Sequence, residues 1–114
     1  MHSLSLFVIF IQLTMGLQSL SVEQKIVLYT SQTDIPVERA LAISECESQH
    51  GKYLYNQQGS SAKGIYQFIS KTWENYCEGD VLNEDDNIKC FLKLYPKFPH
   101  WWSCHNILYG EKTY

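Results

Sequence analysis

The chain lacks the features that several functional classes require. Its nine basic residues are scattered rather than gathered in a stripe, so nothing indicates a nucleic-acid-binding surface. It has no glycine-rich phosphate loop, no internal repeat and no low-complexity stretch. It shows no Ser/His/Asp or Cys/His arrangement, and we expect His50, His100 and His105 to be surface residues. The acidic residues between Glu78 and Asp86 lack the glycine and the ligand spacing of a calcium loop. We therefore expect neither a metal nor a cofactor.

The N-terminal segment has the composition of an export signal. Residues 4–17 are mostly apolar, and Ser19-Leu20-Ser21 follows with small residues, which predicts cleavage near Ser21. Because no Lys or Arg precedes the apolar run, an uncleaved membrane anchor remains the alternative, although about 14 apolar residues are short for a membrane span. We expect a signal peptide over residues 1–21, one domain over residues 22–104 and a polar tail over residues 105–114. The processed protein would be a secreted or periplasmic monomer without a membrane span.

Four cysteines in an exported chain indicate two disulfides. Three pairings are possible. We favour Cys77 with Cys90, because the intervening loop is short and both residues flank predicted helices, which leaves Cys46 with Cys104. A zinc site is the competing interpretation, but the sequence has no Cys-x-x-Cys pair.

Apolar periodicity and helix-boundary residues predict a mainly α-helical domain. Proline is expected in the first turn of the second helix, while Ser70 and Asn83 are expected to cap the third and fourth. A loop-rich region over residues 51–69 completes a small helical domain stapled by disulfides. The predicted helices cover residues 22–31, 36–49, 71–77 and 84–95, with a last short helix from Pro99.

Glu47 is the candidate proton donor. At 100° per residue it shares the apolar side of its helix with Ala40 and Ile43, while Glu38 and Glu45 fall on the opposite side. Burial disfavours the charged carboxylate and raises its pKa, which would let this acid protonate a glycosidic oxygen near neutral pH. The alternative is an inert, half-exposed glutamate at the end of a helix.

Aromatic and amide side chains supply candidate ligand contacts. Gln67 lies alone between Tyr66 and Phe68, where it could hydrogen-bond substrate beside the acid or bond to backbone at the edge of the core. We expect Trp73 to be a core residue. The pair Trp101-Trp102 is equally compatible with packing and with stacking on sugar rings.

Several segments together resemble the lysozyme-like superfamily, most closely its single-domain lytic transglycosylases, including the resuscitation-promoting-factor-like forms. The resemblance covers about residues 36–104. It implies that Glu47 is the catalytic acid, that Ser48 supports it, and that Tyr66 and Gln67 line the sugar site. It also implies that Asn87 contributes to the cleft from a later helix and that Tyr95 stands in for a tyrosine of the larger soluble enzymes. The segments are Cys46-Glu47-Ser48, Asn56, residues 60–68, Thr72-Trp73 and Asn87-Ile88.

One departure from the family bears on the reaction. Animal-type lysozymes carry a second catalytic carboxylate at the position that is Ala62 here. The resemblance then implies a one-acid lytic transglycosylase that cleaves the MurNAc-GlcNAc β-1,4 bond of peptidoglycan and leaves a 1,6-anhydro sugar. Two alternatives stay open. One is a lysozyme-type hydrolase with a water positioned by Asp80 or another acid, and the other is a non-catalytic glycan-binding or inhibitory module.

Overall fold

The computed structural model describes residues 19–110, so most of the predicted leader and residues 111–114 lie outside it. Within this range the chain forms five α-helices and a 3-10 turn, with no extended strand, which confirms the mainly α-helical prediction. No helix in the range is long and apolar enough to cross a membrane. The elements are α2 (Val22–Thr30), α3 (Val37–Ser48), α4 (Ser70–Tyr76), α5 (Glu84–Leu94), η2 (Pro99–Trp101) and α6 (Ser103–Tyr109).

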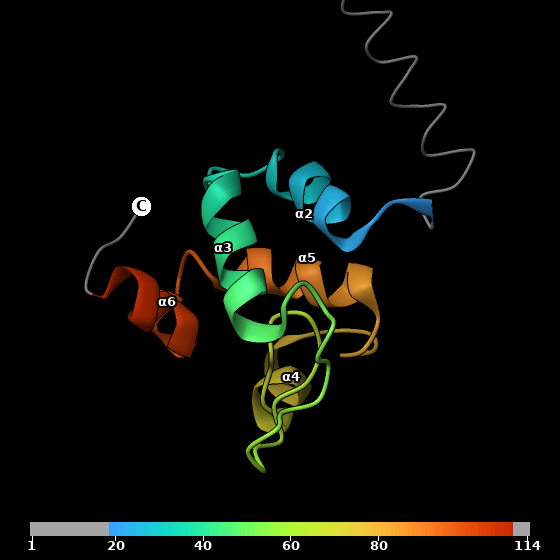
Figure 1. Ribbon diagram of the computed structural model, residues 1–114, viewed down its shortest axis with the longest axis vertical. Coiled ribbons are helices and arrows are strands. Elements are labelled where there is room, and N and C mark those ends of the chain that lie inside the picture. The colour runs from blue at the N-terminus through green and yellow to red at the C-terminus, as the bar shows by residue number, and fades with distance from the viewer. Residues whose placement is uncertain (1–18, 111–114) are drawn as a thin grey trace, which may run out of the picture.

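The helices surround one aromatic and aliphatic core. Helix α2 packs on α3 and α5, and α3 packs on α6, while the loop from residue 51 to residue 69 projects beside α4 (Figure 1). In the core, Tyr66 stacks on Phe91 with ring centroids 3.7 Å apart, and Trp102 meets Phe91 edge-on at 5.0 Å. The core therefore joins the loop region to α5 and to the segment before α6.

The helix starts agree with the sequence prediction at Asn83 and differ from it at Ser70 and Pro36. Ser21, which lies at the end of the predicted leader, is the N-cap of α2 and forms a capping box with Gln24. Asn83 caps α5 as predicted, accepting from the N–H of Asp86. Ser70 instead lies within α4, whose N-cap position is Ile69, and its N–H binds the Ser61 hydroxyl. Pro36 is the N-cap residue of α3 rather than part of its first turn.

Both predicted disulfides are present. Cys46 at the end of α3 is joined to Cys104 in α6, and Cys77 after α4 is joined to Cys90 in α5. All four sulfur atoms are therefore used in disulfides, which overturns the zinc alternative. The pairing connects each of two peripheral helices, α4 and α6, to a central one.

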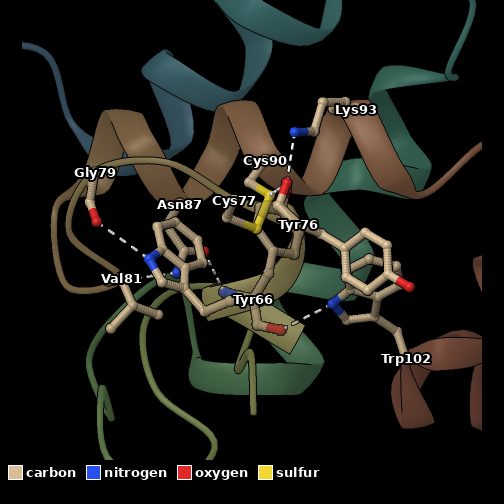
Figure 2. Close-up of a disulfide and its surroundings, with 10 residues drawn as sticks. Tyr66, Tyr76, Cys77, Gly79, Val81, Asn87, Cys90, Lys93 and Trp102 are labelled. Carbon is tan, nitrogen blue, oxygen red and sulfur yellow. Dashed lines mark hydrogen bonds between the residues drawn. A yellow bond between two sulfur atoms is a disulfide. The ribbon is translucent and has the colours of Figure 1, made fainter. Parts of the chain in front are cut away.

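The loop over residues 51–69 is held by short backbone pairings rather than by strands. Lys63 forms isolated antiparallel bridges with Tyr55 and with Phe68. At Gly64 the backbone has φ +84°, and an added Cβ would lie 2.2 Å from Nδ2 of Asn87. Asn87 accepts from the N–H of Tyr66 and donates to the carbonyl of Val81, so it fastens this loop to α5 (Figure 2).

The C-terminal part differs from the prediction of a polar tail from residue 105. Helix α6 continues to Tyr109, and His105 is completely buried rather than a surface residue. The Tyr95 hydroxyl and Nδ1 of His105 are 2.6 Å apart. Burial, with the nearby charges of His100 and Arg39, lowers the pKa of His105. Helix α6 is therefore part of the domain, because its inner face completes the core.

Candidate functional site

Glu47 lies in the last turn of α3, between the disulfide residue Cys46 and the buried Ser48. Its side chain is half-buried, whereas Glu38 and Glu45 on the same helix are exposed, as the helical periodicity predicts. One carboxylate oxygen, Oε2, accepts from the backbone N–H of Cys104 at 3.2 Å. Cys104 in α6 therefore holds Glu47 by a hydrogen bond and holds Cys46, the residue before Glu47, by the disulfide.

The environment of Glu47 favours the protonated acid. Burial raises the pKa of Glu47 to about 7 from an ordinary value of 4.5, and the hydrogen bond from Cys104 opposes that rise without cancelling it. A carboxyl group with a pKa near the working pH can both give and take a proton. This is the property that a general acid and base requires.

Ser48 organises the backbone around the acid. Its hydroxyl donates to the carbonyl of Ile65 at 2.7 Å and accepts from the N–H of Gly51 at 2.8 Å. The residue is buried, so it holds the end of α3 against the loop region rather than meeting a ligand.

The side chain of Gln67 bonds to the backbone, which is one of the two alternatives that the sequence left open. Its side-chain amide donates to the carbonyls of Leu54 and Gly64, at 3.1 and 2.9 Å, which is the backbone-bonded arrangement. Yet Gln67 also lines a surface groove, so its side chain is fixed at a solvent-facing wall. Its backbone has φ +53°, an uncommon conformation for a residue other than glycine.

Three other predicted site residues are buried in the scaffold. Tyr66, Asn87 and Tyr95 have no exposed surface. Tyr66 donates its hydroxyl to the carbonyl of Ala40, and burial raises the pKa of the Tyr66 phenol. The three side chains are enclosed by the scaffold and present no exposed surface to a ligand.

The groove beside Gln67 has a volume of about 300 Å³. Trp102 separates it from the core, with its indole N–H donating to the carbonyl of Tyr66 at 3.0 Å (Figure 2). Cys104, whose N–H donates to Glu47, lies two residues after Trp102, but Glu47 itself is not among the residues that line the groove. The lining residues are Gln67, Phe68, Ile69, Thr72, Trp101 and Trp102.

A second acid is not among the causes that shift the pKa of Glu47, which are burial and the Cys104 N–H. Asp80, the candidate for positioning water, is exposed and accepts from the N–H of Leu82 in its own turn, at 2.8 Å. Ala62 is buried and carries no titratable group. In the described part of the chain, Glu47 is therefore the acid with a strongly raised pKa.

The structure also contains a Ser–His–carboxylate chain that the sequence analysis missed. The Ser44 hydroxyl contacts Nδ1 of His50, and Nε2 of His50 lies 3.2 Å from Oε2 of Glu45. Ser44 is completely buried, so no substrate can reach its hydroxyl for nucleophilic attack. The left-handed backbone at Gln49 and His50 folds the chain back onto α3 and brings His50 against Ser44. No residue pattern in the sequence predicted this turn.

Comparison with known proteins adds no assignment. No protein-family model matches the chain, and neither a curated protein nor a solved structure does.

Proposed function

We propose that the chain is a peptidoglycan-cleaving lytic transglycosylase in which Glu47 acts first as general acid and then as general base. The observation that carries the proposal is the half-buried carboxyl group of Glu47, with a pKa of about 7 and one oxygen held by the Cys104 N–H. The resemblance of the surrounding segments to lytic transglycosylases supports the substrate, the MurNAc-GlcNAc β-1,4 bond.

The proposed reaction needs only this acid. Glu47 donates its proton to the bridging oxygen while the bond from that oxygen to the sugar C1 breaks. The N-acetyl group of the substrate stabilises the resulting positive centre. The C6 hydroxyl of the same sugar then attacks C1, and the carboxylate of Glu47 accepts the hydroxyl proton. The product is a 1,6-anhydro sugar, and no water is consumed.

Two further features support this setting. Ala62 leaves the second-carboxylate position without an acid, so the covalent route that needs two carboxyl groups about 5 Å apart lacks its partner there. The two disulfides are typical of proteins that fold in an oxidising compartment, and with the predicted export signal they favour a secreted or periplasmic enzyme.

The test is digestion of purified cell-wall sacculi with product analysis by mass spectrometry. We expect anhydro products from the parent protein and a loss of at least about a hundredfold in rate for Glu47→Gln, the usual contribution of a general acid. Glu45→Gln is the matched control, because Glu45 is exposed and lies two residues away on the same helix. Its rate should stay within about twofold of the parent, since it donates no proton in this scheme.

Each other outcome refutes a specific part of the proposal. Reducing ends that have gained water would identify a hydrolase. Lysis undiminished in Glu47→Gln would reject the catalytic assignment. Glycan binding without any cleavage by the parent protein would identify a non-catalytic module.

A further inference from the structure

His105 is a buried histidine that the proposed reaction does not use. Its side chain has no exposed surface, and it lies in α6 directly after Cys104, whose N–H binds Glu47. Helix α6 lies at the edge of the domain, where it packs against α3 and the turn η2 (Figure 1). His105 therefore joins this peripheral helix to the core at the residue next to the contact with the acid.

The ring of His105 is paired on one side only. Nδ1 lies 2.6 Å from the hydroxyl of the buried Tyr95. Nε2 is buried as well, and within residues 19–110 it has no hydrogen-bond partner. An uncharged ring can carry its single hydrogen at Nδ1, toward the Tyr95 oxygen. A protonated ring carries a hydrogen on both nitrogens, and the one at Nε2 would be buried without an acceptor.

The groups that face His105 also oppose a proton on its ring. From η2, the ring of His100 meets that of His105 edge-on, with centroids 5.0 Å apart. From α3, Arg39 lies over the ring of Tyr109, which is itself 5.7 Å from that of His105. Burial and the charges of His100 and Arg39 lower the pKa of His105 from its ordinary value of 6.5. Within residues 19–110, no carboxylate is among the causes of that shift, although Glu47 meets the backbone of the preceding residue.

These contacts make the packing of α6 depend on pH. A histidine whose pKa is lowered on folding binds its proton less tightly in the folded state, so its contribution to stability is present above about pH 6.5 and is lost as pH falls. The loss acts first on α6, because the protonated ring reaches water when this short helix moves outward. The disulfide between Cys46 and Cys104 still holds the start of α6 to α3, so the opening is local.

Opening of α6 also disturbs the N–H that binds the acid. The N–H of Cys104 is fixed by α6 as well as by the disulfide, so release of the helix loosens its direction toward Oε2 of Glu47. We propose that uncharged His105 positions Glu47 through Cys104, and that protonation of His105 at acidic pH releases α6 and slows the reaction. This inference rests on the proposed function, because it takes Glu47 to be the proton donor.

The reaction scheme alone gives a different pH dependence. Because its pKa is about 7, Glu47 is already protonated in acidic solution, and a one-acid reaction keeps its rate as pH falls. A loss of rate on the acidic side therefore requires another titrating group. In this proposal that group is His105.

The test is the initial rate of cell-wall digestion by the full chain between about pH 6.5 and about pH 4.5. We expect the parent to lose about threefold or more of its rate over this range and to recover it when the pH is raised again. His105→Gln is uncharged at every pH, and its rate should change by less than about twofold. His100→Gln is the matched control, because His100 is an exposed histidine beside the same ring, and it should keep the loss seen in the parent.

A measurement on the parent alone covers the case in which His105→Gln does not fold, as judged by circular dichroism. Hydrogen exchange with mass spectrometry gives the protection of the α6 amides, after correction for the intrinsic effect of pH on exchange. Between the same two pH values we expect protection in α6 to fall by about fivefold or more, while protection in α5 stays within about twofold.

The inference is overturned if α6 keeps its protection at acidic pH, or if α6 opens while the rate of digestion stays constant. It is also overturned if folded His105→Gln loses rate as the parent does, or if His100→Gln abolishes the loss.

The two proposals fail in distinguishable ways. A parent protein that leaves cell wall uncut at every pH would refute the enzyme, and hydrogen exchange would still decide whether acidic pH releases α6. Glu47-dependent cleavage with a constant rate on the acidic side would support the enzyme and refute His105 as a positioning residue.

Discussion

Cys104 acts on Glu47 through two bonds at once. Its backbone N–H donates to Oε2 of Glu47 at 3.2 Å, and its sulfur is bonded to Cys46, the residue directly before Glu47. The end of α3 and the start of α6 are thereby joined at the acid. The backbone N–H of Cys104 is fixed in place by α6 and by the disulfide. These two features therefore set the direction of the Glu47 carboxyl group, which accepts from that N–H.

This arrangement predicts different effects from removing the two disulfides. Replacing Cys46 and Cys104 by alanine should lower kcat on cell wall by about tenfold or more even where the protein stays folded, because the acid loses its orientation. Replacing Cys77 and Cys90 should change kcat by less than about threefold, since that bond lies away from Glu47. In the chain-entropy model the losses of stability are similar, about 4 and about 3 kcal/mol for sequence separations of 58 and 13.

The measurement is kcat at a temperature where circular dichroism shows both double variants folded. Equal kcat values for the two variants would contradict an orienting role for the Cys46–Cys104 bond.

The pH dependence of activity should follow the protonation of Glu47. Burial raises the pKa of Glu47 to about 7, so the proton that the first step needs is present below that pH and is lost above it. We expect kcat/KM to fall by close to tenfold per pH unit well above about pH 7. Initial rates of wall digestion across pH check this, with Glu45→Gln expected to give the same curve. A rate that rises steadily through this range would argue against Glu47 as the initial proton donor.

The stability of Glu47→Gln should exceed that of the parent at alkaline pH. A carboxyl group whose pKa is raised on folding binds its proton more tightly in the folded state, so the protein loses stability as pH rises from about 4.5 to about 7. That difference corresponds to at most about 3 kcal/mol, and solvent around the half-buried side chain reduces it to on the order of 1–2 kcal/mol. Glutamine is uncharged and can still accept from the Cys104 N–H.

Urea unfolding at about pH 4 and about pH 8 measures this effect. We expect Glu47→Gln to gain stability over the parent only at the higher pH. A gain of the same size at both pH values would show that removal of a buried charge is not the cause.

Two glycines with the same positive φ provide a test of the loop attachment. Gly64 and Gly59 both have φ +84°, but a Cβ at Gly64 would clash with Asn87 and the Val81 carbonyl, whereas nothing lies within 4 Å at Gly59. Gly59→Ala should cost about 1–2 kcal/mol of stability from backbone strain alone. Gly64→Ala should cost a further 1–3 kcal/mol or so, because the loop must shift away from α5.

Chemical denaturation of both variants gives the comparison directly. We also expect Gly64→Ala to lose activity on cell wall, because the segment before Gln67 would move, while Gly59→Ala keeps it. Similar stabilities for the two variants would show that the contact with Asn87 does not hold the loop in solution.

The helices, the disulfide pairing and the direction of Glu47 were predictable because each depends on short stretches of chain. Ala40, Ile43 and Glu47 share a side of α3 through the 3.6-residue helical period alone. Cys77 and Cys90 lie close because the loop between them is short, and the remaining pair then follows. Asn83 was identifiable as a cap because its side chain accepts from an N–H only three residues away.

The placement of the aromatic and polar site residues depended on contacts between distant parts of the chain. Trp102 is buried because its N–H reaches the carbonyl of Tyr66, 36 residues away, and this leaves its neighbour Trp101 exposed. His105 enters the core because its ring meets Tyr95, the C-cap residue of α5. No local sequence pattern distinguishes the buried Trp102 from the exposed Trp101, or identifies His105 as a buried histidine.

The amino-acid sequence by itself therefore determined the secondary structure, the two crosslinks and an inward-facing acid, since neighbouring residues suffice to set them. Only the tertiary structure decided which side chains meet the solvent around that acid. Exposure at the surface is what remains after the whole core has packed, and it is a property of all the helices together.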